Sequence, residues 1–118
     1  MRKDDLIRLR HMLEAAREAV SFAQNRFRSD LDSDRMLVLS LVKSIEIVGE
    51  AAARVTKECR HRYPEIPWPN IIAMRNRLIH AYFDIDLDRV WDTVFDDLPP
   101  LIASLEQILL LEDPPTSS

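Results

Sequence analysis

The chain has 118 residues, a formal net charge of -4, a single glycine and an aromatic content of 7%. This length suits one domain with its own core, and the scarcity of glycine and aromatic residues disfavours a strand-and-turn architecture. The negative charge excludes a wholly basic face for nonspecific nucleic-acid binding, although it leaves room for a small local site.

The first expected helix runs from about Asp4 or Asp5 to about Phe27. Its apolar residues recur at steps of three and four, as in helical bundles. They are Leu6, Leu9, Leu13, Ala16, Val20, Ala23 and Phe27. The polar segment 28–33 is rich in capping residues, so we expect it to connect two helices.

The second expected helix spans about Asp34 to Arg60, and residues 36–48 place apolar side chains nearly all round it. A small domain cannot easily bury the whole circumference of a helix. The surplus therefore favours a second subunit packing there, with a deep core position as the alternative. Gly49 lies mid-helix, where glycine costs about 1 kcal/mol relative to alanine, so we expect another helix to approach closely there.

The longest break follows, because the prolines between Pro64 and Pro69 favour a rigid, extended crossing over a helix. A basic cluster precedes it and comprises Lys57, Arg60, His61 and Arg62. Such a cluster is typical of a solvated helix end, where cations are favourable. The alternative is a patch that contacts phosphate.

The third expected helix starts near Pro69 or Asn70 and weakens around residues 82–86. On a regular helix Arg75 falls near the middle of the apolar face, and His80 lies about 140° away from it. A buried guanidinium needs an anionic partner, and Glu46 and Glu50 on the second helix are available. Arg75 and His80 cannot lie side by side on one regular helix. If the two residues act together, either the helix distorts or a second copy of the chain completes their site.

The aspartates of segment 84–88 alternate, which is compatible with a cation site but far more typical of helix capping. An amphipathic helix should follow from Leu87 or Asp88 through Leu98, with Pro99-Pro100 kinking or restarting it before a last helix, 101–109. The sequence therefore predicts an all-α, antiparallel bundle of four to five helices in one domain, residues 1–111. Residues 112–118 should form a disordered tail.

Four polar residues on the third helix remain as candidates for chemistry: Arg75, Asn76, His80 and Tyr82. A neutral histidine can take the 2′-hydroxyl proton of RNA, and an arginine can stabilise charge that develops on the phosphate. Asn76 precedes His80 by one helical turn and could orient its imidazole. This chemistry requires neither a metal nor a cofactor. The alternative is a helix-end histidine beside a structural ion pair.

Location can be predicted from three negative features. Cys59 is the lone cysteine, so a reducing cytoplasm and an inert, structural thiol are expected. Asp4 and Asp5 directly follow the first basic residues, which is unlike a secretory leader. The longest uncharged apolar run, 36–42, is far shorter than the roughly 20 residues of a membrane span, so we expect no membrane association.

Residues Arg75 to Tyr82 resemble the Arg-x4-His-x-Tyr signature of the HEPN superfamily. The surroundings are similar to its HepT-like branch, in particular Ile47-Val48-Gly49-Glu50-Ala51, Pro64-Glu65-Ile66-Pro67-Trp68, the run 82–88, Val90-Trp91 and Asp97-Leu98-Pro99. The resemblance covers about residues 5–109. It departs at Pro69-Asn70, where the family more often has a charged residue followed by aspartate.

The resemblance implies a homodimeric helical domain and a ribonuclease toxin of a toxin-antitoxin pair, active on cellular RNA such as tRNA. It implies that Arg75 and His80 are catalytic and that Asn76 assists. The implied partner is a small MntA-like nucleotidyltransferase, which neutralises the toxin by transferring AMP to Tyr82.

Two other functions stay open. One is a noncatalytic HEPN subunit that assists a separate nucleotidyltransferase, and the other is a purely structural helical dimer. If RNA binds, the expected contacts are Arg77 and three residues of the basic cluster: Lys57, Arg60 and Arg62.

Overall fold

The computed structural model describes residues 1–81 and 84–114, with the backbone alone at His80 and Ala81. Its first half contains α1 (Lys3–Ala23), α2 (Asp30–Ser33), α3 (Arg35–Arg54) and α4 (Lys57–Arg62). Its second half contains α5 (Trp68–Ile72), α6 (Met74–Leu78), β1 (Ile79–Ala81), β2 (Asp84–Ile85), α7 (Leu87–Asp92), the π-helical turn η1 (Thr93–Asp97) and α8 (Leu98–Glu112).

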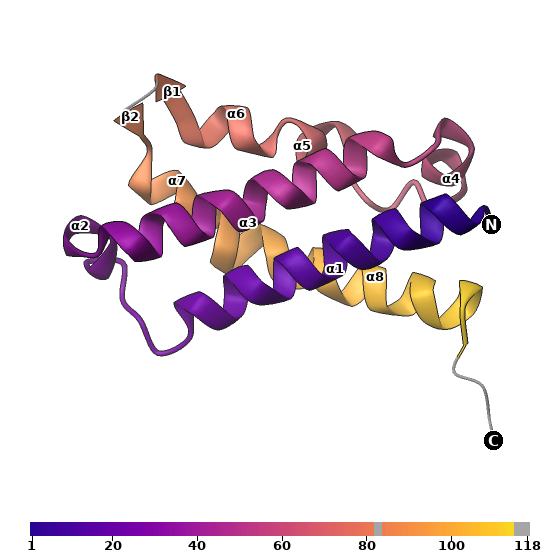
Figure 1. Cartoon of the computed structure of the whole chain (residues 1–118), viewed down its shortest axis with the longest axis horizontal. Coiled ribbons are helices and arrows are strands. Elements are labelled where there is room, and N and C mark those ends of the chain that lie inside the picture. Colours follow the sequence, from indigo (N-terminus) through magenta and orange to yellow (C-terminus); the bar gives the residue numbers. More distant parts are fainter. Residues whose placement is uncertain (82–83, 115–118) are drawn as a thin grey trace.

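Of the three long helices, α1 runs antiparallel to both α3 and α8, which point in the same direction (Figure 1). α1 packs along α3 and α8, while α5 and α6 return along α3 in the opposite direction. α7, η1 and α8 then lead back to the end of the bundle where the chain began. The predicted all-α class and antiparallel arrangement are therefore confirmed, apart from the short β1–β2 pair.

The first helix ends earlier than the sequence pattern suggested. α1 stops at Ala23, and Asn25 adopts a left-handed backbone with φ of 62°, a conformation in which asparagine often terminates helices. Phe27 was predicted to continue the buried seam, but its side chain is 74% exposed. The predicted connection 28–33 contains the single helical turn of α2.

The predicted second helix is in fact two helices. Val55 is extended and buried, and the Thr56 hydroxyl caps α4 by accepting a hydrogen bond from the Cys59 amide at 3.2 Å. A threonine at this position satisfies an otherwise orphan N–H of the new helix. The prediction that one helix continues to Arg60 is therefore wrong.

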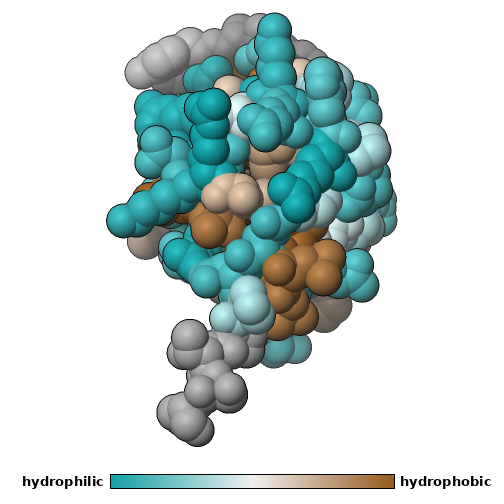
Figure 2. Space-filling view, turned by 90° about the vertical axis from the view of Figure 1, so that its right-hand side faces the viewer, coloured by the Kyte–Doolittle hydropathy of each residue, from teal (hydrophilic) through white to brown (hydrophobic). Residues whose placement is uncertain are grey.

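The apolar surplus of α3 is mostly absorbed by the core of the chain itself. Leu41 and Ile45 are fully buried, whereas Met36 is 80% and Leu39 48% exposed. The alternative of a deep core position therefore holds for most of this helix. Figure 2 shows the end of the bundle where α1 begins. On this face of the molecule, hydrophilic surface separates the apolar areas from one another.

Gly49 lies at the closest approach between α3 and the α5 segment. A Cβ added to it would lie 3.3 Å from the carbonyl oxygens of both Ile71 and Ile72. This spacing explains the absence of a side chain, because backbone carbonyls cannot move aside as easily as a flexible side chain. The predicted close approach is confirmed.

The third helix differs most from the prediction. It begins at Trp68, with Pro69 in its first turn, and it breaks at Ala73, where ψ is 0°. α6 then ends at Leu78, and the chain continues into β1, which pairs antiparallel with β2. The expected weakening around residues 82–86 therefore occurs about one turn earlier.

The predicted restart of the helix at the double proline Pro99-Pro100 is confirmed. η1 widens the preceding turn, and α8 begins at Leu98 with both prolines in its first turn. Proline cannot donate the usual backbone hydrogen bond, and its ring crowds the preceding turn, so a wider turn relieves both problems. α8 includes Glu112, which corrects the predicted start of the tail; residues 115–118 lie outside the described part.

Candidate functional site

Arg75 lies on the surface of α6, and its side chain is 49% exposed. The prediction that it sits in the middle of a buried apolar face is wrong. The break at Ala73 changes the phase of the helix, so that Met74 and Leu78 face the core instead. Arg75 can therefore contact a solvent-borne anion without any rearrangement of the core.

Glu46 of α3 holds the Arg75 guanidinium. Arg75 Nε donates to Glu46 Oε2 at 3.0 Å, and Lys43 Nζ lies 3.6 Å from the other carboxylate oxygen. Burial would raise the pKa of Glu46, but the hydrogen bond from Arg75 and the charge of Lys43 outweigh it, so this pKa is lowered. The carboxylate stays ionised near neutral pH.

The contact uses only Nε of Arg75, and it does not involve the two Nη groups, which carry four N–H donors. Glu50, the other candidate partner, instead lines a shallow pocket with Arg8 and His11 of α1. The Glu46 carboxylate therefore lies on the face of α3 towards α6, and the Glu50 carboxylate lies on the face towards α1.

His80 lies on β1 rather than on a helix, so the angle of about 140° expected on a regular helix does not apply to it. Its side chain lies outside the described residues, as does all of Tyr82. The described chain thus shows that the helix ends between Arg75 and His80. Asn76 is exposed on α6.

Arg77, also on α6, is joined to α5 by a hydrogen bond. Its Nη2 donates to the Asn70 side-chain oxygen at 2.8 Å. Burial and the nearby Asp96 raise the pKa of Asp97, whereas the charge of Arg77 lowers it. Arg77 is thus exposed and tied to Asn70, and its charge acts on Asp97 of η1.

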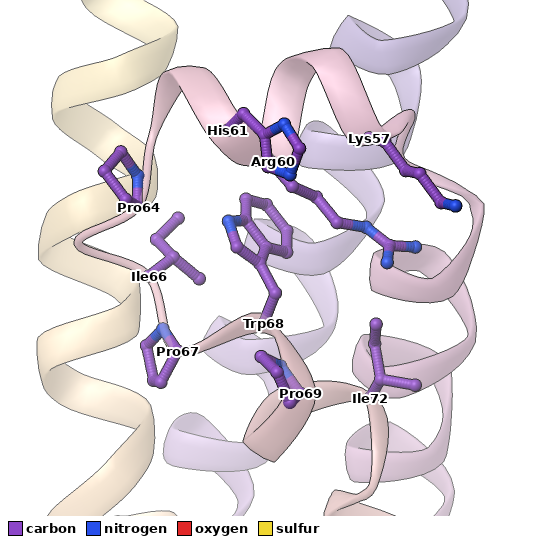
Figure 3. A pocket seen from close by; sticks show the side chains of 9 residues that line it. All are labelled: Lys57, Arg60, His61, Pro64, Ile66, Pro67, Trp68, Pro69 and Ile72. Atoms are coloured by element: carbon purple, nitrogen blue, oxygen red, sulfur yellow. The ribbon is translucent and has the colours of Figure 1, made fainter.

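The basic cluster is divided between two faces. Lys57, Arg60 and His61 line one surface cavity of about 880 Å³ (Figure 3). Arg62 instead lies beside Glu112 of α8, with Nη2 3.4 Å from its carboxylate. Arg60 Nη2 donates to the carbonyls of Ala52 and Ala53, at the C-terminal end of α3. Of the expected RNA contacts in this cluster, Lys57 and Arg60 are brought together and Arg62 is not.

Two aspartates of segment 84–88, Asp86 and Asp88, make structural contacts. The Asp86 side chain caps α7 by accepting from the Arg89 amide at 3.0 Å, and Asp88 accepts from Arg28 Nε at 2.6 Å. Capping, rather than a cation loop, is therefore confirmed for Asp86. Among the residues that the structure describes, no cluster of three or more His, Cys, Asp or Glu side chains could hold a metal ion.

Burial raises the pKa of the Cys59 thiol to about 11, with Asp5 and Glu112 contributing their negative charge. A thiol with this pKa is almost fully protonated near neutral pH and is a poor nucleophile. The predicted inert role of Cys59 is therefore supported by its surroundings.

Sequence reasoning missed one buried charge, Asp5. Its side chain is 3% exposed and accepts hydrogen bonds from the Thr56 amide and hydroxyl, which joins the start of α1 to the start of α4. The helix-capping preference of Thr56 was a readable signal, but its pairing with a residue 51 positions away was not.

Comparisons with known proteins identify a family for this chain. The "Ribonuclease HepT-like" family matches residues 12–108. None of the described helices is long and apolar enough to cross a membrane. No solved structure matches the chain significantly.

Among curated relatives, "Putative RNase TTE0752" of Caldanaerobacter subterraneus subsp. tengcongensis is 32% identical over 88% of this chain and 93% of its own length. "Probable ribonuclease HepT" of Thermococcus cleftensis is 33% identical over 81% of this chain and 91% of its own length. A longer relative, "Gamma-glutamylcyclotransferase and putative RNase MJ0434" of Methanocaldococcus jannaschii, is 34% identical over 92% of this chain but only 49% of its own length. The chain belongs to the HepT-like ribonuclease family of the HEPN superfamily.

Proposed function

We propose that this protein is an endoribonuclease that cuts cellular RNA at a site built from Arg75 and His80. The observation that carries the proposal is the position of Arg75, which is half-exposed and held by Glu46 within a chain of the HepT-like family. A guanidinium held in this way can bind a phosphate through its Nη groups while Nε keeps its carboxylate.

In the proposed reaction, neutral His80 removes the proton of the 2′-hydroxyl, which attacks the adjacent phosphorus. The protonated imidazole then donates to the 5′-oxygen that leaves. Arg75 stabilises the negative charge on the phosphate in the transition state, and Asn76 helps to orient the imidazole. The products are a 2′,3′-cyclic phosphate and a free 5′-hydroxyl, and no metal takes part.

A cleavage assay on tRNA and bulk RNA in EDTA tests this proposal. Wild-type protein should cut, whereas His80→Ala and Arg75→Ala should each lower the rate by at least about 100-fold, the usual loss when a general base or a charge-stabilising donor is removed. Cleavage that survives in either variant, or no cleavage by clean wild-type protein, would reject the assignment.

We further propose that the enzyme is the toxin of a toxin-antitoxin pair. Its partner, a nucleotidyltransferase, transfers AMP from ATP to the Tyr82 hydroxyl and releases pyrophosphate, which adds negative charge and bulk two residues after His80 in the sequence. Intact mass after co-expression with the partner is the test. Loss of the AMP increment in Tyr82→Phe supports the assignment, whereas an unchanged increment removes it.

A homodimer is part of the same proposal, because family members of this kind pair and because α3 exposes Met36 and Leu39. Light scattering of the wild type should give twice the mass of 13.7 kDa, and Met36→Lys with Leu39→Lys should lower the dimer affinity. A wild-type monomer at micromolar concentration would refute it.

The second candidate is a noncatalytic subunit that assists a separate nucleotidyltransferase. The net charge of -4 favours it, since most RNA-binding surfaces are basic. It predicts that the purified protein binds its partner tightly and leaves RNA intact, so the cleavage assay separates the two functions.

A further inference from the structure

We propose that the cavity between α4 and α5 binds one nucleotide of the RNA substrate, with the base in the cavity and a neighbouring phosphate on Lys57 and Arg60. The inference rests on the proposed ribonuclease function and extends it to a substrate-positioning site outside the stretch 75–82. The cavity has a volume of about 880 Å³, within the usual range of about 300–1,000 Å³ for small-molecule sites.

The walls of the cavity differ in chemistry (Figure 3). α4 supplies Lys57, Arg60 and His61 along one side, and the opposite side is apolar. The apolar lining consists of Pro64, Ile66, Pro67, Trp68, Pro69 and Ile72. The described residues that line the cavity include no carboxylate, although the chain as a whole is acidic. This combination suits an occupant with a flat apolar part and a negative charge, as in a nucleotide.

Arg60, one of the three basic residues of this wall, is held in place by hydrogen bonds. The Arg60 guanidinium is fixed by the Ala52 and Ala53 carbonyls, at 3.3 and 2.8 Å. Its Nε is buried and has no hydrogen-bond partner among the described residues, which is uncommon for an arginine donor. Trp68 forms part of the floor and is oriented by a hydrogen bond from Nε1 to the Tyr63 carbonyl at 3.0 Å.

The cavity and Arg75 lie along the same helix. Glu46 of α3 contacts Arg75, Gly49 lies against Ile72, and the Ala53 carbonyl contacts Arg60. Glu46 and Ala53 are seven residues apart, so at about 1.5 Å per residue the two positions are separated by about 10 Å along the helix. At a rise of roughly 3.4 Å per nucleotide, a stacked strand covers this distance with about three nucleotides. One strand can therefore place a phosphate at Arg75 and a base in the cavity.

The first experiment scans a cleavable RNA oligonucleotide with one abasic sugar at successive positions. An abasic site two to four nucleotides from the cut should raise KM by about 10-fold and leave kcat nearly unchanged, because it removes only a binding contact. Lys57→Ala should raise KM by several-fold as well, because it removes the contact with the neighbouring phosphate. Arg17→Ala is the matched control: it removes the same charge from an exposed position on α1 and should leave KM unchanged.

The second experiment does not need catalysis. Trp91→Phe leaves Trp68 as the single tryptophan, and AMP or an uncleavable deoxy-containing oligonucleotide is titrated while its fluorescence is followed. Stronger binding of the oligonucleotide than of AMP identifies a nucleotide within a strand as the ligand, whereas equal binding identifies a free nucleotide in the same cavity. In either case Lys57→Ala should weaken binding by several-fold.

The two proposals fail in different ways. If the wild type does not cut RNA but Trp68 still reports nucleotide binding, the ribonuclease proposal falls and the cavity assignment stands. If RNA is cut but the abasic scan is flat and Trp68 does not respond, the cavity assignment is overturned. It is also overturned if Lys57→Ala abolishes binding of a partner protein while every RNA parameter stays the same.

Discussion

Replacing Asp5 with alanine should destabilise the protein far more than its place near the start of the chain suggests. Asp5 Oδ1 accepts from the Thr56 amide at 2.9 Å, and Oδ2 accepts from the Thr56 hydroxyl at 2.7 Å. The same hydroxyl accepts from the Cys59 amide at 3.2 Å. One buried carboxylate therefore sets the first turn of α4, the helix that carries Lys57 and Arg60.

The magnitude follows from the two lost contacts. A hydrogen bond to a charged group contributes about 1.5–3 kcal/mol, and Asp5→Ala also leaves the partly buried Thr56 donors without their acceptor. We expect a loss of about 3–5 kcal/mol from the free energy of unfolding, a large share of the roughly 5–15 kcal/mol typical of a domain. Asp5→Asn should cost less, because its amide oxygen can still accept from the Thr56 amide.

Urea unfolding followed by far-UV circular dichroism measures this loss. Asp4→Ala is the matched control, because Asp4 is exposed in the same first turn and loses only a helix-dipole interaction of about 1 kcal/mol or less. A double-mutant cycle with Thr56→Val isolates the coupling between the two residues. If Asp5→Ala costs no more than Asp4→Ala, the proposed tie between α1 and α4 is refuted.

Three further changes test other contacts. Glu46→Gln should alter stability by less than about 1 kcal/mol, since Arg75 is half-exposed, yet it should slow RNA cleavage clearly more than Glu50→Gln does; equal rates would contradict the positioning role. Gly49→Val should lower the free energy of unfolding by about 1–3 kcal/mol by pushing against two carbonyls, whereas a stabilised variant in urea would disprove the close packing. The pKa of Cys59 is raised to about 11 from 9.0, so alkylation of the folded protein at pH 8 should be about 100-fold slower than alkylation of the protein unfolded in urea; a fast reaction of the folded protein would contradict the assigned burial. For the same reason, the free energy of unfolding should decline as pH rises from 9 towards 11.

Much of the fold could be predicted because helical periodicity is a local property. The steps of three and four that placed Leu9, Leu13 and Ala16 on one face are the steps that the core uses. The cap at Asp86 and the glycine at a close approach were also readable, since each residue type has few structural reasons to occupy such a position. These features depend on neighbours within one or two turns, or on the absence of a side chain.

The errors arose where two local preferences competed. Asn25 and Thr56 carry weak signals for a helix end and a helix start, and the apolar pattern that continues past each of them favoured an unbroken helix. At Arg75 the periodicity was extrapolated through Ala73, where the helix changes phase. A missed break changes the predicted direction of every later side chain in the helix, and for this reason Arg75 was predicted to be buried although it is half-exposed.

In the candidate site, too, some features could be predicted from the sequence and others could not. The identities of Arg75 and His80, their spacing and the two candidate carboxylates, Glu46 and Glu50, are all contained in the sequence. The choice of Glu46 over Glu50, the pairing of Asp5 with Thr56 and the cavity between the cations of α4 and the apolar side chains of α5 required the packed chain. These contacts join residues from different helices, and their geometry depends on how the helices cross, a property that no local pattern of residues encodes.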